Sequence, residues 1–192
     1  MRVLVVPDTQ YKEIQLMCGG ITVVSPEDYS RLNKYRWHKR KDDGYASRTV
    51  YEDGKFKTIR LHQEIINIPV GFVTDHINRD RLDNRRSNLR KATRSQNMAN
   101  SKIPLTNTSG YKGVYYRKEQ DRWRASIRVD QEHISLGQYG SPEEAAKAYN
   151  DAALKYFGEF ASLNKLPSVE AVEVFDVEET ERGEGGFGST GV

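Results

Sequence analysis

Apolar and polar residues alternate most regularly between residues 122 and 129. Side chains along a β-strand point to opposite faces in turn, so every second residue shares a face. One face of this stretch is apolar and consists of Trp123, Ala125, Ile127 and Val129. The other face is polar and consists of Arg122, Arg124, Ser126 and Arg128. The pattern predicts a strand that packs one face on a core and leaves arginines on the other.

The residues around this strand predict a small sheet covered by one helix. Further strands are expected at 111–117 and 134–139. Ser141-Pro142-Glu143-Glu144 is typical of a helix start, and Gly158 is typical of a stop after Phe157. Within this helix an apolar stripe at helical spacing contains Ala145, Tyr149, Ala152 and Tyr156. Its small alanines would let the helix lie close on the apolar face of the sheet.

A second pattern, between residues 73 and 101, predicts a strand, a loop, a strand and a helix. The strands are expected at 73–77 and 89–93, the polar turn-forming loop at 78–84 and the helix at 94–101. Thr93 or Ser95 would cap this helix, and Asn97 would lie in its first turn. The arrangement places Asp75 and His76 at the end of a strand, with Asn97 facing back towards them.

The N-terminal third predicts short strands and two short helices, with Trp37 in the core. The Asp53-Gly54 pair is a strong hairpin signal. Ser25 would cap the first helix, with Pro26 at its first position. The expected strands are 2–6, 21–24, 45–51 and 56–61, and the expected helices are 25–35 and 60–68.

These elements predict an α+β protein with five segments. They are a β-rich N-terminal lobe (1–59), a central unit (60–101), a linker rich in Pro, Ser, Thr, Asn and Gly (102–110), the sheet-and-helix module (111–166) and an acidic, Gly-rich tail (167–192). The tail has the composition of a disordered segment.

Charge is distributed unevenly along the 192 residues, although the formal net charge is only +3. From Glu170 onward seven acidic residues accompany one arginine, so residues 1–169 carry +9. Between Arg79 and Lys102 eight basic residues accompany two acidic ones. A basic segment of this kind favours a polyanionic partner, such as double-stranded DNA.

Other features bound the setting in which the chain works. Cys18 is the only cysteine, which excludes a disulfide framework or a Cys-rich zinc site and favours a reducing compartment. No apolar run approaches the length of a membrane span, and the N-terminus lacks a signal-peptide pattern. We therefore expect a cytoplasmic protein that does not contact a membrane.

The residue types of the central unit suit metal-assisted cleavage of a phosphodiester. Asp75 offers a carboxylate and Asn97 a carbonyl oxygen, which are the ligands that Mg²⁺ or Mn²⁺ prefers. The imidazole of His76 could take a proton from the attacking water. The alternative for each residue alone is a turn former or a solvated side chain, and only their joint occurrence favours catalysis.

The motif D-H-I-N-x-D-x-x-D-N-R-x-x-N-L-R-x-A-T-x-x-Q-N resembles the HNH endonucleases of the phage homing type, over about residues 60–101. The resemblance implies a ββα-metal nuclease fold, with His76 as general base and Asn88 bracing the loop and orienting that base. Asp75 and Asn97 would hold the metal, Asn97 standing where many members have a histidine. Arg94 would steady the phosphate. We expect His62 to pack beneath the site.

The module that follows resembles the Apetala/ethylene-response-factor DNA-binding domain, over about residues 107–164. The matching motifs are Y-K-G-V, W-R-A-S-I, L-G-Q-Y, S-P-E-E-A-A-K-A-Y-N-D-A-A and F-A-S-L-N. Tyr115 and Ser135 depart from the plant pattern, so the plant target sequence is not implied. By this resemblance the residues that contact DNA are Lys112, Tyr115, Arg117, Arg122, Arg124 and Arg128.

The last residues, about 169–192, resemble the C-terminal motif of the trimeric dUTPases. In that family the tail folds over a nucleotide, which would here involve Arg182, Phe187, Ser189 and Thr190. No other dUTPase motif occurs upstream, so dUTP hydrolysis by this chain alone is not predicted. Our hypothesis is that a homing endonuclease gene entered a dUTPase gene, and an association with dUTPase subunits is a minor alternative.

Three classes of function therefore remain open. The favoured class is a metal-dependent DNA endonuclease, acting as a monomer that nicks. The second is a sequence-specific DNA-binding regulator without catalysis, and the third is a fragment or partner of a dUTPase. Asp75, His76 and Asn97 together favour the first, because DNA binding alone does not require them.

Overall fold

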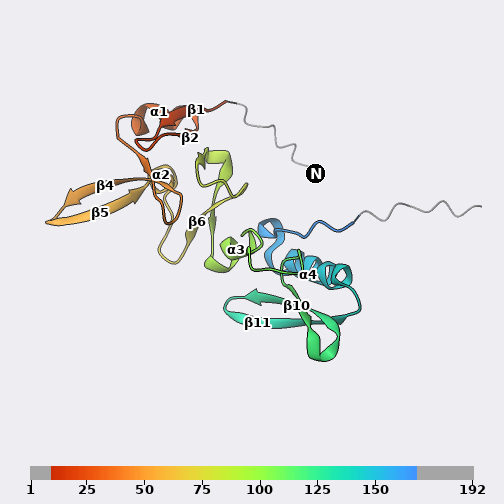
Figure 1. The fold of residues 1–192 in the computed structure, drawn as a ribbon. Coiled ribbons are helices and arrows are strands. Elements are labelled where there is room, and N and C mark those ends of the chain that lie inside the picture. Colours follow the sequence, from red (N-terminus) through yellow and green to blue (C-terminus); the bar gives the residue numbers. More distant parts are fainter. Residues whose placement is uncertain (1–9, 168–192) are drawn as a thin grey trace, which may run out of the picture.

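The N-terminal lobe and the start of the central unit contain two small sheets and the short helices α1 and α2 (Figure 1). This computed structural model describes residues 10–167. Strands β1 (Lys12–Gln15) and β2 (Ile21–Val24) form an antiparallel pair, followed by helix α1 (Pro26–Leu32). Strands β3 (His38–Lys39), β4 (Ala46–Glu52) and β5 (Lys55–Arg60) form the second sheet, and helix α2 (Leu61–Ile65) follows.

The hairpin between β4 and β5 turns where the sequence predicted. Asp53 and Gly54 have φ angles of 50° and 75°. Two successive positive φ angles match the right-handed twist of the strands that they join, and Asp-Gly adopts them easily. The prediction is confirmed, and the hairpin projects from the body of the lobe in Figure 1.

The central unit has the predicted order of strand, loop, strand and helix. Strand β6 (Val73–His76) pairs antiparallel with β8 (Leu89–Ala92), and helix α3 (Arg94–Ala99) follows. The loop between them holds the short strand β7 (Asp83–Asn84) and the 3-10 turn η1 (Arg86–Asn88). β7 pairs in parallel with β2 of the N-terminal lobe, which the sequence did not predict.

Helix α3 begins at the predicted cap. The hydroxyl of Thr93 accepts a hydrogen bond from the backbone N–H of Gln96, and the Gln96 side chain accepts one from the backbone N–H of Thr93. This reciprocal pair satisfies two amides that a helix start leaves without partners. The pair also fixes the first turn of α3, and Asn97 follows Gln96 directly in this helix.

The C-terminal module is a three-stranded antiparallel sheet with one helix on it. Its strands are β9 (Val114–Arg117), β10 (Arg122–Val129) and β11 (Glu132–Tyr139), and their order in the sheet is β11-β10-β9. The 3-10 turn η2 (Lys118–Gln120) connects β9 to β10. Helix α4 (Pro142–Phe157) covers one face, and η3 (Gly158–Phe160) follows it. Ala125 and Ile127 are buried beneath α4, as the alternating pattern predicted.

Two groups of buried side chains cross the segment boundaries that composition suggested. One joins the N-terminal lobe to the central unit and includes Trp37, Leu61 and Leu89. Trp37 is fully buried, as predicted. A second joins the central unit to the C-terminal module, because Ala99 of α3 packs with Tyr149 and Phe157 of α4. The N-terminal lobe, the central unit and the C-terminal module are therefore packed against one another.

Some local predictions were wrong. Tyr156 is 41% exposed, and Phe157 is buried in its place, because the buried stripe of α4 runs through Ala153 to Phe157. The hydroxyl of Ser25 does not cap α1 but accepts a hydrogen bond from the backbone N–H of Arg86, at 2.9 Å.

The predicted strand at 2–6 and the tail residues Arg182, Phe187, Ser189 and Thr190 lie outside the described residues. Within the described part of the chain, no helix is long and apolar enough to cross a membrane.

Candidate active site

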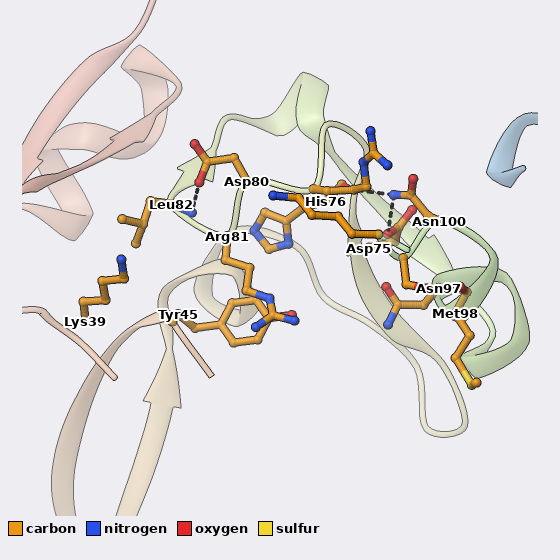
Figure 2. Close-up of a pocket in the computed structure, with 14 residues that line it drawn as sticks. Lys39, Tyr45, Asp75, His76, Asp80, Arg81, Leu82, Asn97, Met98 and Asn100 are labelled. Carbon is orange, nitrogen blue, oxygen red and sulfur yellow. Dashed lines mark hydrogen bonds between the residues drawn. The ribbon is translucent and has the colours of Figure 1, made fainter. Parts of the chain in front are cut away.

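A cavity of about 510 Å³ lies at the end of β6, between the loop that follows this strand and helix α3. Asp75, His76 and Asn97 all line it, and Figure 2 shows their side chains around it. Cationic side chains from three segments also line the cavity: Lys39, Arg79, Arg81 and Lys102. The three residues of the predicted catalytic group are thus gathered in one cavity with a positively charged rim, which suits a phosphate backbone.

Asp75 and His76 can face the same cavity because β6 ends at His76. In a continued strand, neighbouring side chains would point to opposite faces. The backbone turns sharply here instead: the N–H of Arg79 bonds to the carbonyl of His76, and Arg79 has a φ of 66°. The polar loop predicted from the sequence therefore allows both side chains to serve one site.

The imidazole of His76 is fixed by Asn84, a residue that the sequence did not single out. Nε2 of His76 lies 3.2 Å from Oδ1 of Asn84. The Asn84 amide is oriented in turn by Thr22, since its Nδ2 donates to the Thr22 hydroxyl at 2.9 Å. That hydroxyl donates its own proton to the carbonyl of Leu82, at 2.7 Å.

This chain of donors determines the tautomer of His76. The Thr22 hydroxyl gives its proton to Leu82, so it acts as an acceptor towards Asn84. The amide nitrogen of Asn84 then faces Thr22, and its oxygen faces His76. An oxygen acceptor requires a proton on Nε2, which leaves the lone pair of a neutral imidazole on Nδ1. A histidine held in this way is suited to accept a proton through Nδ1.

The surroundings of His76 keep it neutral. Burial lowers the pKa of His76 below its usual value, while the hydrogen bond to Asn84 and the charge of Asp75 act in the opposite direction. The rings of Tyr45 and His62 lie against it, at 5.6 Å and 5.3 Å between centroids. His62 is itself buried, and burial lowers its pKa to about 3. As expected, His62 packs beneath the site, where it supports the base as a neutral ring.

Asp75 is held from both sides. Its Oδ2 accepts a hydrogen bond from Nε of Arg90, at 2.8 Å, and its Oδ1 accepts one from Nδ2 of Asn100, at 2.9 Å. Asn100 also donates to the carbonyl of His76, at 2.9 Å. Arg90 stands directly opposite Asp75 in the β6–β8 ladder. The carboxylate is therefore fixed in orientation by one residue from β8 and one from the end of α3.

The oxygen donors of this cavity fit a small divalent cation. Each Asp75 oxygen accepts one hydrogen bond and retains a lone pair, and Asn97 adds an amide to the same cavity. Across residues 10–167 no cluster of three or more His, Cys, Asp or Glu side chains could enclose a metal. One or two oxygen ligands with open positions for water and phosphate are characteristic of Mg²⁺ sites.

Asn88 staples the loop that follows β6. Its Oδ1 accepts from the backbone N–H of Asn78, and its Nδ2 donates to Oδ1 of Asn78 and to the carbonyl of Asp83, all between 2.7 and 2.9 Å. These contacts brace the loop. The side chain bonded to His76, however, is that of Asn84, whereas Asn88 contacts the loop that follows β6.

Arg94 lies away from the cavity that Asp75 and His76 line. It lines a separate cavity with Arg128 and Asp130, between α3 and the turn that joins β10 to β11. The backbone N–H of Asp130 donates to the Ser95 hydroxyl beside it, at 3.0 Å. A direct contact between Arg94 and a phosphate at His76 is therefore not part of this arrangement.

The open face of the C-terminal sheet carries most of the residues predicted to contact DNA. Arg124 stands opposite Tyr115, and Arg122 stands opposite Arg117. Residues directly opposite in an antiparallel pair share a face, so these four side chains lie together, away from α4. Arg128 continues the row along β10. The face is basic, with the Tyr115 ring among its arginines.

Lys112 is placed differently. Its ammonium donates to the carbonyls of Met98, Ala99 and Ser101 at the C-terminal end of α3, at 3.2, 2.6 and 2.9 Å. Burial, followed by the nearby charge of Arg79, lowers the pKa of Lys112 to about 8. Lysine at this position fastens α3 to the C-terminal module and is not presented with the arginines of the open face.

Comparison with known proteins identifies two regions of the chain. The HNH endonuclease family model matches residues 67–99, and the AP2 domain model matches residues 109–159. An uncharacterized HNH endonuclease of Acanthamoeba polyphaga mimivirus is 34% identical over 152 residues, which cover 77% of this chain and 76% of that protein. Protein 3.8 of Escherichia phage T7 is 40% identical over 63 residues, 33% of this chain and 52% of its own length.

A third relative matches the C-terminal module alone. An ethylene-responsive transcription factor-like protein of Arabidopsis thaliana is 45% identical over 42 residues, 22% of this chain and 18% of its own length. The fold and the two matched regions define the class: a nuclease that carries a DNA-binding domain. More particularly, the chain belongs to the HNH endonuclease family. HNH nucleases typically use divalent metals. The nuclease domain and the AP2 domain of this chain indicate DNA as its partner.

Proposed function

We propose that this protein is a homing-type DNA endonuclease that hydrolyses a phosphodiester bond with the help of Mg²⁺ or Mn²⁺. The observation that carries the proposal is the convergence of Asp75, His76 and Asn97 on one cavity with a cationic rim. Its partner is double-stranded DNA, and it acts as a monomer that nicks.

Each residue has a separate role in this proposal. Asp75 and Asn97 hold the cation, which supplies charge stabilisation to the phosphate and to the departing oxygen when it is bound. His76 accepts the proton of the attacking water through Nδ1, because its Nε2 is engaged by Asn84. Asn88 braces the loop on which the site depends.

DNA is gripped outside the cavity in this proposal. The open face formed by Tyr115, Arg117, Arg122, Arg124 and Arg128 contacts the duplex, since arginine can bridge two acceptors of guanine in the major groove. Arg94 contributes a phosphate contact next to Arg128, because the two line one cavity. Among the residues paired in the sheet of the C-terminal module, no acidic side chain stands opposite the arginines of this face, which favours DNA over a neutral partner.

A plasmid-nicking assay tests the proposal. Supercoiled DNA carrying the locus of the gene is incubated with the wild-type protein and Mg²⁺ or Mn²⁺, with and without EDTA. We expect metal-dependent nicking, reduced about 10²- to 10⁴-fold by His76→Ala, since that is the usual contribution of a general base. Asp75→Ala should be equally impaired. Asp151→Ala removes an exposed carboxylate from α4 and serves as the matched control.

Two results would contradict the proposal. Equal nicking by His76→Ala and the wild type would place the chemistry elsewhere. If the wild type binds DNA but cuts none of it with either metal, the regulator becomes the better assignment.

A further inference from the structure

One arginine of the central unit contacts both Asp75 and the C-terminal module. Arg90 lies on β8, and its Nε donates to the Asp75 carboxylate at 2.8 Å. The same guanidinium donates through Nη1 to the backbone carbonyl of Glu159, at 3.1 Å, and lies over the Phe160 ring, 3.8 Å from its centroid. Glu159 and Phe160 belong to η3, directly after α4. One side chain thus contacts both modules at once.

The contact is shielded from water. The Arg90 side chain is only 14% exposed, and that of Asp75 is 3% exposed. A guanidinium over an aromatic face is attracted by the ring, and the attraction is larger where water is excluded. The Phe160 ring therefore lies against the same guanidinium whose Nε donates to Asp75.

The second group that holds Asp75 also rests on the C-terminal module. Asn100 follows α3 directly, and the neighbouring Ala99 packs with Tyr149 and Phe157 of α4. The backbone N–H of Ser162 donates to the carbonyl of Ala99, at 3.3 Å. Both sides of the Asp75 carboxylate are therefore supported by the segment between α4 and residue 162.

We propose that Phe160 and Arg90 are positioning residues of the nuclease site, through which the docked DNA-binding module fixes the orientation of the Asp75 carboxylate. The inference rests on the function proposed above and adds to it. The C-terminal module then does more than bring the nuclease to DNA, since it completes the geometry of the site. Loss of the Phe160 ring should impair cleavage without weakening the grip on DNA.

Cleavage and binding are measured separately on the full-length protein. We expect Phe160→Ala to reduce the turnover number about 10-fold, as for other residues that orient a ligand side chain. Affinity for the same DNA in EDTA should stay unchanged, because the open face of the sheet is untouched. Phe160→Tyr keeps the ring and should restore turnover. Phe160→Leu keeps apolar volume without a π face, and it should remain impaired while folding normally.

Tyr156→Ala is the matched control. Tyr156 is an aromatic residue near the end of α4, which precedes Phe160. It is 41% exposed and has Lys155 beside its ring at 5.6 Å. It has no contact with Arg90 among the interactions of the described residues. We expect both turnover and DNA affinity to remain at wild-type values.

A spectroscopic measurement is independent of cleavage. In the protein labelled with ¹⁵N-arginine, the Nε–H signal of Arg90 is identified by its disappearance in Arg90→Lys. Because this proton is hydrogen-bonded and buried, its exchange with water should be slow in the wild type, Phe160→Tyr and Tyr156→Ala. In Phe160→Ala and Phe160→Leu the exchange should be fast.

The outcomes separate the two proposals. If the wild type does not cleave DNA, the proposed function fails, while slow Nε–H exchange that depends on the ring still supports the positioning of Arg90 by Phe160. If the exchange stays slow in Phe160→Ala, or if turnover and DNA affinity fall together, the positioning inference is wrong.

Discussion

At the scale of single residues, the site depends on side chains whose own partners are buried. His76 has its ring fixed by Asn84, and Asn84 has its amide fixed by Thr22 from the N-terminal lobe. Asn84 and Thr22 are almost completely buried. A hydrogen-bond chain of this kind holds one tautomer, because reversing any member would bring two donors or two acceptors together.

Replacing Asn84 should impair cleavage more than DNA binding. Asn84→Leu removes the acceptor for Nε2, so we expect turnover to fall about 10- to 100-fold, as when a partner that orients a ligating or catalytic histidine is lost. Thr22→Val removes only the group that orients the amide and should show a smaller loss. Initial nicking rates at saturating DNA measure both. Equal rates for Asn84→Leu and the wild type would refute the role of Asn84.

At position 113 the packing around the backbone leaves no room for a side chain, so only glycine fits there. Its φ is +74°, and a Cβ at this position would lie 2.2 Å from Cδ2 of Tyr149 and 2.6 Å from the carbonyl oxygen of Ser126. We expect Gly113→Ala to lower the free energy of unfolding by about 3–5 kcal/mol, since strain and overpacking add. Gly54→Ala is the control, because Gly54 has a φ of +75° but no atom within 4 Å. Gly54→Ala should lower the free energy of unfolding by only about 1 kcal/mol, and urea denaturation measures both variants.

At the scale of elements, α3 is the connection between the two modules. It is only six residues long, so its position depends on tertiary contacts more than on helix propensity. Thr93 fixes its start, and the ammonium of Lys112 satisfies carbonyls at its end. Because Asn97 lies on this helix and Asn100 follows it, any shift of α3 would move two of the side chains around the cavity.

Lys112→Met should therefore affect folding and leave DNA binding intact. Three backbone carbonyls lose a charged donor, which should cost about 1–3 kcal/mol of unfolding free energy. The salt dependence of DNA affinity should not change, because Lys112 does not lie with the arginines of the open face. In contrast, Arg117→Met should leave stability unchanged and reduce the salt slope by about 1. An equal reduction by Lys112→Met would restore Lys112 as a phosphate contact.

At the scale of the whole molecule, the protein is held together by cores that cross module boundaries. Leu89 of β8 packs with Trp37 and Leu61, while Ala99 of α3 packs on α4. The candidate active-site cavity is lined by residues of both the N-terminal lobe and the central unit. The stability of the protein and the geometry of this cavity are therefore linked. A buried ionisable group near the cavity should make the free energy of unfolding depend on pH.

His62 is such a group, and it predicts acid sensitivity. Its pKa is lowered to about 3 in the folded protein, from the ordinary value of 6.5. Above pH 6.5 the ring is neutral in both states, so no penalty arises. Below pH 6.5 the unfolded chain binds a proton that the folded state excludes, and stability falls until about pH 3. At pH 5 the loss should be about 2 kcal/mol relative to pH 7.

Urea denaturation at pH 5 and pH 7 measures this loss. His62→Gln cannot titrate and should lose about 2 kcal/mol less between the two pH values than the wild type. His133→Gln replaces an exposed histidine and should lose as much as the wild type. An unchanged pH dependence in His62→Gln would show that His62 is not excluded from protonation.

The sequence by itself determined the local structure and the identity of the central residues. Alternation fixes the faces of β10, Asp53-Gly54 fixes a hairpin, Thr93 fixes the start of α3, and the Asp75-His76 pair with Asn97 marks the nuclease unit. The first three features were predictable because each depends on neighbours in sequence, through strand alternation, turn conformation or helix capping. The nuclease unit was identified from its residue types and from the resemblance of its motif to the HNH endonucleases.

Only the tertiary structure decided which distant side chains support them. Asn84 and His76 lie eight residues apart within one motif, but the motif does not show that their side chains bond to each other. Thr22 lies 62 residues from Asn84 and outside that motif. The same holds for Arg90 and Phe160, which belong to different modules. It also holds for Lys112, which was predicted to contact DNA and instead donates to carbonyls at the end of α3. Burial and hydrogen bonding between segments are set by the packing of the whole chain, and a local pattern cannot encode them.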